Sequence, residues 1–258
     1  MKRVLTGLLL AIGIGALVFL TPGWTFILVV AAISALALHE FFRIAAKGGI
    51  QPFVLAGHAA ALLWILLPNL DRGYFATLFA VVLCGAAVFA PVPFASLLPA
   101  VGVTVTGLLY VAGPMLWGIL LHDLSPLWLF FVLLVVAVGD ISALAVGRKF
   151  GSRKLAPRTS PRKTWEGSIA SVVVGTTVGS LYAGAFLGSQ IGLVEAAILS
   201  LVVNVFGQVG DLFESALKRA AGVKDSGTLL PGHGGVLDRI DAALFGIPVV
   251  YGYVHLFV

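Results

Sequence analysis

The sequence predicts an all-α fold: a polytopic helical bundle of about nine transmembrane helices in an integral membrane protein. Of the 258 residues, 60% are hydrophobic and only 10% are charged, against roughly 25% charged residues in an ordinary soluble domain. The mean hydropathy is +1.08. Apolar stretches close to the ~20 residues that cross a bilayer follow one another along the chain. This composition leaves no segment for a separate soluble domain and predicts a single membrane domain over residues 1–258.

Breaks at charges, Pro and Gly divide the apolar sequence into nine candidate membrane spans. The first span follows Met1-Lys2-Arg3, and residues 21–24 after it offer no small-residue cleavage site. We therefore interpret it as a retained span and not as a signal peptide. The expected spans are 4–20, 24–42, 53–68, 73–90, 98–121, 126–147, 167–188, 192–212 and 241–258.

The basic residues predict the orientation of these spans, because cytoplasmic loops are enriched in Lys and Arg. With a cytoplasmic N-terminus, the cytoplasmic loops hold 15 of the 16 basic residues, all except Arg72. We therefore expect the N-terminus and the active site to face the cytoplasm. The net charge of +5 then reflects topology and an anionic ligand, and it does not indicate nucleic acid.

Acidic residues are concentrated in the second half of the chain. Residues 139–241 contain eight of the eleven Asp and Glu residues. The expected organisation is therefore a set of N-terminal apolar spans over residues 1–125 and a catalytic half over residues 126–258. Few ionisable groups lie in the first five spans, namely His39, Glu40 and His58.

The expected span at 192–212 carries a polar stripe that continues beyond its cytoplasmic end. Its members are four, three, four and three residues apart, so they share one helix face. Polar residues also hold membrane helices together by hydrogen bonds, and this alternative stays open for two of them. The members are Asn204, Gln208, Asp211, Ser215 and Lys218.

Two intramembrane carboxylates, Asp140 and Asp211, are functional candidates because a carboxylate in a membrane span is costly without a partner or a watery cavity. Asp140 lies about eight residues before the cytoplasmic end of its span, hence about 12 Å deep. An ion pair with a purely structural role stays open for Asp140.

A glycine-rich loop leads into the last expected span, between Lys224 and Asp241. Its glycines let backbone amides approach an anion closely, while Lys224 and Arg239 add positive charge. Asp238 and Asp241 share a helix face and are able to bind a hard cation. Equally, Asp238 would cap the last helix and Asp241 would interact with its dipole. Mg²⁺ usually takes one or two carboxylates plus substrate phosphates, so Asp211 with Asp238 would suffice.

The longest basic loop, from Arg148 to Glu166, carries seven Lys and Arg residues. Anchoring on anionic lipid accounts for this charge. It does not account for the ordered run Ser-Pro-Arg-Lys-Thr-Trp-Glu-Gly at residues 160–167. Lys163 and Thr164, near a helix start, would instead hold phosphate oxygens. Both interpretations stay open on the residues alone.

Together these segments resemble the phosphatidate cytidylyltransferase family, also called CDP-diacylglycerol synthases. The family signature joins four short segments at set distances: Ser-x-apolar-Lys-Arg, Lys-Asp, His-Gly-Gly and Asp-Arg-apolar-Asp. This chain matches them at Ser215 to Arg219, Lys224 to Asp225, His233 to Gly235 and Asp238 to Asp241. The likeness extends over about residues 139–241, since it includes Gly139-Asp140, the run at 160–167 and Gly207 to Asp211.

This resemblance implies that CTP reacts with phosphatidic acid to give CDP-diacylglycerol and pyrophosphate. It also implies a divalent metal, a homodimer and a place in a bacterial inner membrane. We expect Mg²⁺ as the cofactor and consider a second, monovalent cation beside it. The expected partners are CTP, phosphatidic acid, membrane lipid and a second copy of the chain.

We assign the expected site residues by chemical type, with carboxylates on the metal and basic or glycine residues on the phosphates. The metal ligands are Asp211 and Asp238, with Asp241 and Asp140 as further candidates. The catalytic residues are Asp211, Asp238, Lys163, Lys218 and Arg219. The substrate-binding residues are Lys163, Thr164, Lys218, Arg219, Lys224, His233, Gly234, Gly235 and Arg239.

Two other functions compete with this one. A transporter would line a pathway with Asp140, Asn204, Gln208 and Asp211. Against it, the polar residues crowd toward the cytoplasmic side and no inverted repeat is evident. A CDP-alcohol phosphotransferase would need an Asp-Gly-x-x-Ala-Arg pattern, which the sequence lacks.

Overall fold

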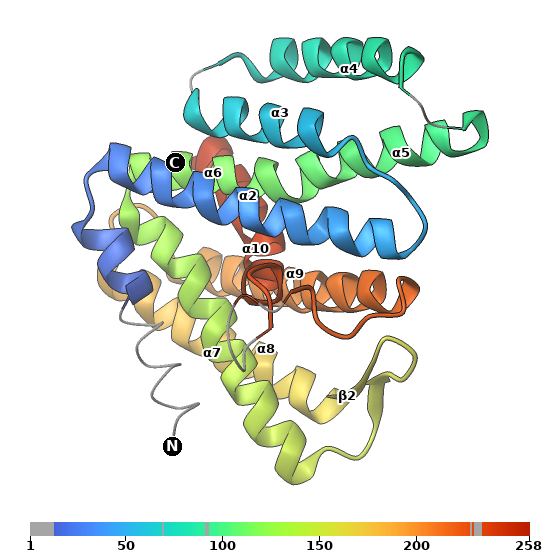
Figure 1. Ribbon diagram of the computed structural model, residues 1–258. Coiled ribbons are helices and arrows are strands. Elements are labelled where there is room, and N and C mark those ends of the chain that lie inside the picture. The colour runs from blue at the N-terminus through green and yellow to red at the C-terminus, as the bar shows by residue number, and fades with distance from the viewer. Residues whose placement is uncertain (1–12, 69, 91–92, 228, 230–233) are drawn as a thin grey trace. The chain divides into compact units, whose positions relative to one another are not determined.

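A computed structural model describes residues 13–68, 70–90, 93–227, 229 and 234–258 (Figure 1). Most of this part of the chain is helical, and it also contains a two-stranded antiparallel sheet. Six helices within these ranges are long and apolar enough to cross a membrane, by length and composition. Helices satisfy their own backbone hydrogen bonds, which is the condition for crossing lipid. The chain is therefore a helical integral membrane protein.

In the described part of the chain, a helical stretch at residues 13–20 comes before the other α-helices. They are α2 (Gly23–Lys47), α3 (Val54–Leu66), α4 (Arg72–Val88), α5 (Phe94–Gly107), α6 (Gly113–Leu124), α7 (Pro126–Phe150), α8 (Trp165–Phe186), α9 (Leu193–Ala220) and α10 (Leu237–Phe257). A π-helical segment, η1 (Leu108–Ala112), joins α5 to α6. Between α7 and α8 lie the strands β1 (Lys154–Ala156) and β2 (Ser160–Thr164).

Each expected span from the second onward corresponds to a helix, but several boundaries differ. The fifth span is part of a run from Phe94 to Leu124 that is 31 residues long. The eighth continues past residue 212 to Ala220. Helices α3 and α4 have 13 and 17 residues, fewer than the ~20 that cross a bilayer. The first expected span, 4–20, lies partly outside the described residues, so the count of nine stays a prediction.

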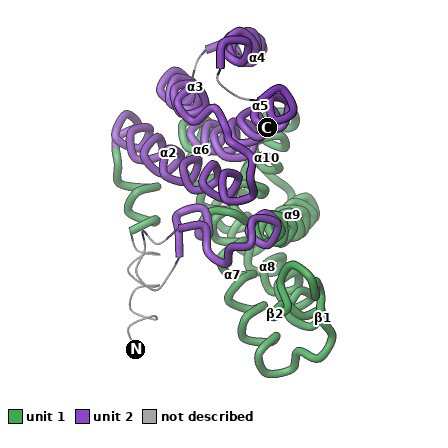
Figure 2. The backbone as a smooth tube through the Cα atoms, turned by 45° about the vertical axis from the view of Figure 1, so that its right-hand side comes forward, with its two compact units in different colours: residues 1–21, 120–216, 240–258 green, residues 22–119, 217–239 purple. Residues whose placement is uncertain are grey.

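Two compact units make up the chain (Figure 2). Unit 1 holds α7, the hairpin, α8 and most of α9 and α10, while unit 2 holds α2 to α5 and the loop that precedes α10. The single membrane domain expected from composition stays a prediction. Unit 1 comprises residues 1–21, 120–216 and 240–258, and unit 2 comprises residues 22–119 and 217–239.

In unit 1, α7 and α8 pack side by side through small residues (Figure 1). A Cβ atom on Gly167 of α8 would lie 2.7 Å from the backbone oxygen of Ala143 on α7. A Cβ atom on Gly139 of α7 would lie 2.3 Å from Asn204 Nδ2 on α9. Small residues let membrane helices approach this closely. The contact fixes the start of α8 against α7.

Local caps determine where α7 and α8 begin. Ser125 Oγ accepts a hydrogen bond from Leu127 N at 3.3 Å, and Pro126 occupies the first turn of α7. Thr164 Oγ1 accepts a hydrogen bond from Gly167 N at 3.2 Å and caps α8. Because Thr164 is also the last residue of β2, the hairpin leads directly into α8.

In unit 2, α2 is held by tight contacts with α3 and α5. Phe42 of α2 is 1% exposed. A Cβ atom on Gly57 of α3 or on Gly107 of α5 would lie 2.6 or 2.7 Å from its ring. After α2 the chain turns through Gly49 at a φ of 88°, a left-handed conformation that glycine adopts without strain. The buried residues of α2 also include Glu40.

Candidate active site

Two groups of charged side chains contain the first-choice metal ligands. The hairpin pair, in unit 1, consists of Lys163 on β2 and Asp211 on α9. The loop cluster, in unit 2, lies around the glycine-rich loop and the start of α10. It consists of Glu40, Lys218, Ser226 and Asp238.

In the hairpin pair, Lys163 Nζ forms an ion pair with Asp211 Oδ2. The two side chains are 26% and 29% exposed. Ser215 Oγ, one turn further along α9, donates to Asp211 Oδ1 at 3.4 Å. The pair thus joins a lysine expected to bind phosphate to a carboxylate expected to bind metal.

The base of the hairpin is closed by Glu166, in the first turn of α8. Its carboxylate accepts hydrogen bonds from Ser152 Oγ at 2.6 Å and from Arg153 N at 3.2 Å. Trp165 N donates to Arg153 O at 2.9 Å. The basic loop is therefore an ordered hairpin, and this order positions Lys163 beside α9.

The polar stripe of α9 divides into two parts. Asn204 is 2% exposed, and its Oδ1 accepts from Ser171 Oγ on α8 at 3.2 Å and from Gln208 Nε2 at 2.8 Å. Ser168 Oγ on α8 donates to Gln208 Oε1. Asn204 and Gln208 thus take part in hydrogen bonds between helices, the structural alternative for these two residues. Asp211 instead faces the hairpin.

In the loop cluster, Asp238 is surrounded by donors and its side chain is 8% exposed. Lys218 Nζ lies 2.5 Å from Asp238 Oδ1. Asp238 Oδ2 accepts from Gly235 N at 2.8 Å, Ser226 Oγ at 3.0 Å and Ser226 N at 3.1 Å. The two oxygens therefore have different roles: Oδ2 holds the loop, and Oδ1 faces an ammonium group.

Asp238 does not cap the last helix, because α10 begins at Leu237 and Asp238 lies in its first turn. The amides at this helix start donate to Glu40 of α2, Val236 N at 3.0 Å and Leu237 N at 2.8 Å. Within unit 1, Asp241 Oδ1 accepts from Ala242 N at 2.8 Å.

Asp241 also lies at a close contact between α9 and α10. A Cβ atom on Gly210 would lie 2.6 Å from Asp241 O. Asp211 follows Gly210 directly in the sequence. The backbones of α9 and α10 are thus in close contact beside Asp211 and Asp241, two of the expected metal ligands.

The remaining expected site residues lie in varied surroundings, and their roles stay predictions. Thr164 is 4% exposed and caps α8. Gly234 has a φ of 78°, and a Cβ atom on it would lie 2.4 Å from Asp238 Oδ2. His233 lies outside the described residues. Exposed side chains are those of Asp140, Arg219, Lys224 and Arg239.

Two members of the loop cluster, Glu40 and Ser226, were not expected from the sequence. Glu40 is a carboxylate inside an apolar span, which by itself indicates a functional candidate. That signal was available, but the surrounding sequence has no signature residue. Ser226 carried no signal, because a serine in a glycine-rich loop is common as a turn residue.

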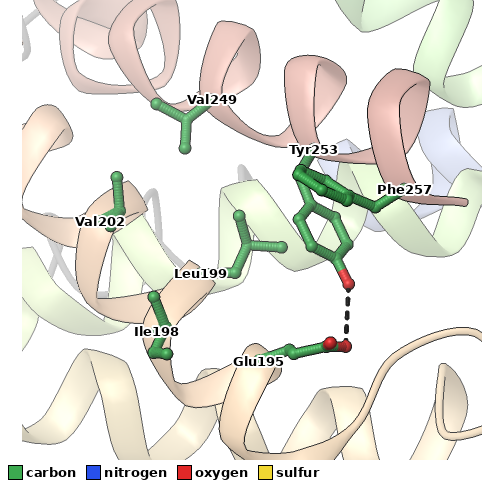
Figure 3. Close-up of a pocket in the computed structure, with 7 residues that line it drawn as sticks. All are labelled: Glu195, Ile198, Leu199, Val202, Val249, Tyr253 and Phe257. Carbon is green, nitrogen blue, oxygen red and sulfur yellow. Dashed lines mark hydrogen bonds between the residues drawn. The ribbon is translucent and has the colours of Figure 1, made fainter.

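A separate hollow of about 300 Å³ lies toward the opposite end of α9 and α10 from Asp211 and Asp241 (Figure 3). Tyr253 OH donates to Glu195 Oε2 there at 3.2 Å. Glu195 is 16 residues from Asp211 along α9, about 24 Å at 1.5 Å per residue. The hollow contains none of the expected site residues. Its lining is Glu195, Ile198, Leu199, Val202, Val249, Tyr253 and Phe257.

The sequence model described as the cytidylyltransferase family matches residues 1–257. The chain belongs to the cytidylyltransferase family.

Three bacterial relatives of this chain are named phosphatidate cytidylyltransferase. The one from Bacillus subtilis (strain 168) is 42% identical over 132 residues, which are 50% of this chain and 48% of that protein. The one from Brucella melitensis is 44% identical over 127 residues, 49% of this chain and 46% of the relative. The one from Staphylococcus saprophyticus is 42% identical over 123 residues, 48% and 47% of the two chains. The matched chain thus spans about half the length of these relatives.

The carboxylates of the two groups suit a magnesium ion that also binds phosphate oxygens. Among the described residues, no group of three or more His, Cys, Asp or Glu side chains could hold a metal ion. Mg²⁺ does not need such a cage, since it takes one or two carboxylates and completes its coordination with water and phosphate oxygens. Asp211 and Asp238 both offer carboxylate oxygens to cationic groups. The residues present therefore fit Mg²⁺.

Proposed function

We propose that the protein is a phosphatidate cytidylyltransferase, which makes CDP-diacylglycerol and pyrophosphate from CTP and phosphatidic acid. The observation that carries this proposal is the pairing of Lys163 with Asp211 and of Lys218 with Asp238. Both pairs join an ammonium group suited to phosphate with a carboxylate suited to Mg²⁺. Family membership and the names of the bacterial relatives select the reaction among those that use these groups.

The proposed chemistry is a direct in-line displacement at the CTP α-phosphorus. An oxygen of the phosphatidate phosphate forms the new P–O bond, and the bond between the α-phosphorus and the bridging oxygen to the β-phosphate breaks. A phosphomonoester has a second pKa of about 6, so the nucleophile is already ionised at neutral pH. No general base is required, and the protein's task is to bring two anions together and stabilise the leaving pyrophosphate.

In the proposed enzyme, Asp211 and Asp238 would hold Mg²⁺, with Asp241 and Asp140 as further candidates. Asp238 would use Oδ1, because Oδ2 already accepts three hydrogen bonds from the loop. When bound, the metal neutralises negative charge on the phosphates and on the leaving pyrophosphate. A second, monovalent cation beside it stays part of the proposal.

Lys163 and Lys218 each have two roles in this scheme. Without substrate each neutralises its carboxylate; with nucleotide and metal bound, each ammonium group turns to phosphate oxygens. Lysine suits such an exchange of partners because its ammonium is a compact charge on a flexible stem. Arg219, Lys224 and Arg239, which are exposed, add further positive charge, and Thr164, His233, Gly234 and Gly235 complete the proposed substrate site.

The proposed setting is the bacterial inner membrane, with nine spans, a cytoplasmic N-terminus and a homodimer as the working form. The distribution of basic residues supports this orientation. It is also the side on which CTP is available. The hairpin and the loop cluster then both contact the cytoplasm, where the nucleotide meets the lipid phosphate.

The test is turnover by the purified protein in phosphatidate-containing vesicles with labelled CTP and Mg²⁺. We expect the label to appear in a lipid-soluble nucleotide and, with equal stoichiometry, pyrophosphate in solution. Folded protein that makes no such product would overturn the proposal. If Asp211-dependent flux of a solute across sealed vesicles occurred without CTP turnover, the transporter hypothesis would replace it.

A further inference from the structure

Glu40 is a buried carboxylate in the part of the chain that has no signature residue. It lies in the second half of α2 and is 5% exposed. A carboxylate in such a place is strongly unfavourable unless hydrogen bonds and charges compensate it. Within the described part of the chain, its side chain accepts hydrogen bonds from Ser226, Val236 and Leu237, nearly 200 positions away in the sequence.

Glu40 supplies the N-terminal cap of α10 from a different helix. Its Oε1 accepts from Val236 N at 3.0 Å, and its Oε2 accepts from Leu237 N at 2.8 Å. The first amides of a helix have no partner within the helix, and a nearby Ser, Thr, Asp or Asn normally satisfies them. A negative charge at this end is also favourable for the helix dipole. The start of α10 therefore depends on α2.

Ser226 connects Glu40 to Asp238. Its Oγ lies 2.8 Å from Glu40 Oε2 and 3.0 Å from Asp238 Oδ2. A hydroxyl has one proton and donates to one acceptor at a time, so Ser226 is shared between the two carboxylates. The backbone of Ser226 is fixed as well, since its N–H donates to Asp238 Oδ2 at 3.1 Å. The three side chains form one connected network.

Two glycines of the loop provide the space for the Glu40 carboxylate. A Cβ atom on Gly227 would lie 2.3 Å from Glu40 Oε1, and one on Gly235 would lie 2.3 Å from Glu40 Oε2. Contacts this short do not occur with real side chains. Gly235 also donates its N–H to Asp238 at 2.8 Å. The loop is therefore built around two carboxylates, Glu40 on one side and Asp238 on the other.

We propose that Glu40 is a positioning residue for cytidylyl transfer: it holds the loop so that Asp238 presents Oδ1 to its cationic partner. This inference rests on the proposed function. Glu40 contacts neither substrate nor metal in this scheme and acts through Ser226 and the amides of residues 235–237. Its loss would misplace Asp238 rather than remove a group that binds nucleotide.

The first test measures turnover by Glu40→Gln and Glu40→Asp in vesicles. We expect kcat to fall by about tenfold or more, since small displacements of reacting groups cost up to about a hundredfold, while KM for CTP stays within threefold. Glu40→Asp keeps the charge and should retain more activity than Glu40→Gln. A kcat within twofold of wild type for Glu40→Gln would overturn the proposal.

Two further variants separate positioning from a general loss of folding. Ser226→Ala keeps Glu40 and its two amide hydrogen bonds but removes the shared hydroxyl, and we expect kcat to fall severalfold with KM for CTP unchanged. Ser34→Ala removes another fully buried polar group from α2 and should leave kcat unchanged. An equal loss of activity in Ser34→Ala and Glu40→Gln would mean that α2 is merely sensitive to substitution, which contradicts the proposal.

Amide hydrogen exchange tests the same inference without any turnover. In Glu40→Gln we expect faster exchange at Val236 and Leu237, and also at Ser226 and Gly235, whose amides donate to Asp238. Faster exchange at Val236 and Leu237 alone would show that Glu40 is only a helix cap and would overturn the proposal. If wild-type protein makes no CDP-diacylglycerol, the proposed function fails, while the exchange measurement still decides whether Glu40 holds Asp238 in place.

Discussion

Asp211 and Asp238, the two carboxylates proposed as metal ligands, lie in very different surroundings. Asp211 is 29% exposed, forms an ion pair with Lys163 and accepts a hydrogen bond of 3.4 Å from the Ser215 hydroxyl. Asp238 is 8% exposed and receives three hydrogen bonds from the loop as well as the ammonium of Lys218. Asp238 therefore also holds the loop in place, which Asp211 does not. Substitution of Asp238 should destabilise the protein more than substitution of Asp211, although both should abolish turnover.

Asp211→Asn and Asp238→Asn test the metal assignment. Each substitution keeps the size of the side chain but removes the negative charge that binds Mg²⁺, so we expect kcat to fall by about a hundredfold or more at saturating Mg²⁺. The measurement is turnover in phosphatidate vesicles over a Mg²⁺ titration. Asp123→Asn, at an exposed position in the last turn of α6, is the control. Activity within tenfold of wild type for both variants would remove the assignment.

Lys218→Met and Lys163→Met test how much each ion pair stabilises the protein. Removing Lys218 takes a partner from a nearly buried carboxylate, which costs about 3 kcal/mol in comparable pairs. Removing Lys163 affects a partly exposed pair, worth about 1 kcal/mol or less. Thermal unfolding in detergent, followed by tryptophan fluorescence, should therefore show the larger decrease for Lys218→Met. The reverse order would contradict the burial seen in the loop cluster.

At the scale of single residues, the sequence selected Lys218 and Asp238 from the signature segments and Asp211 as a carboxylate in a membrane span. The structure pairs Lys218 with Asp238, and the roles of all three residues stay predictions. Glu40 was not selected, because its partners lie 186 to 197 residues away and only folding brings them together. The role of His233 stays a prediction, since it lies outside the described residues.

At the scale of helices and strands, the hairpin between α7 and α8 is the element that the sequence did not predict. Its strands are three and five residues long and rich in Lys, Arg and Pro, so neither alternation nor β propensity marks them. The apolar runs, in contrast, predicted a helix at each described span because length and hydropathy alone determine whether a segment can cross lipid. Helix ends were predicted less well, as α9 shows by continuing to Ala220.

Gly167→Ala and Gly184→Ala test the close packing of α7 and α8. A Cβ atom on Gly167 would lie 2.7 Å from the backbone of α7, whereas nothing lies within 4 Å of one on Gly184, in the same helix. We expect Gly167→Ala to destabilise the protein by about 1–3 kcal/mol. Gly184→Ala should be neutral or slightly stabilising, because alanine favours helix. The measurement is thermal unfolding of both variants. Equal unfolding temperatures for the two variants would contradict the close packing of α7 and α8.

At the scale of the whole molecule, the orientation in the membrane determines whether the proposed site meets CTP. The charge distribution gives a cytoplasmic N-terminus only if the number of spans before each basic cluster is even. The short helices α3 and α4 are therefore critical for the topology, since they have 13 and 17 residues. If either did not cross the membrane, the predicted side of the later loops would change.

Cysteine labelling tests this topology. Cys84 is the only cysteine, so Cys84→Ser provides a background for single cysteines introduced by Asp123→Cys and Arg153→Cys. In intact cells a membrane-impermeant thiol reagent should label position 123 and not position 153, and both should be labelled after the membrane is opened. Labelling of position 153 in intact cells would contradict a cytoplasmic hairpin.

The central claim is that the cytidylyl group of CTP is transferred to a lipid phosphate. Its most direct test gives purified protein phosphatidate vesicles, Mg²⁺ and CTP labelled at either the α- or the γ-phosphorus. We predict that the α-label enters the lipid fraction and the γ-label is recovered only in pyrophosphate, with Asp211→Asn abolishing both. Cytidylyl transfer would be contradicted if the γ-label appeared in lipid, or if both labels remained in CTP.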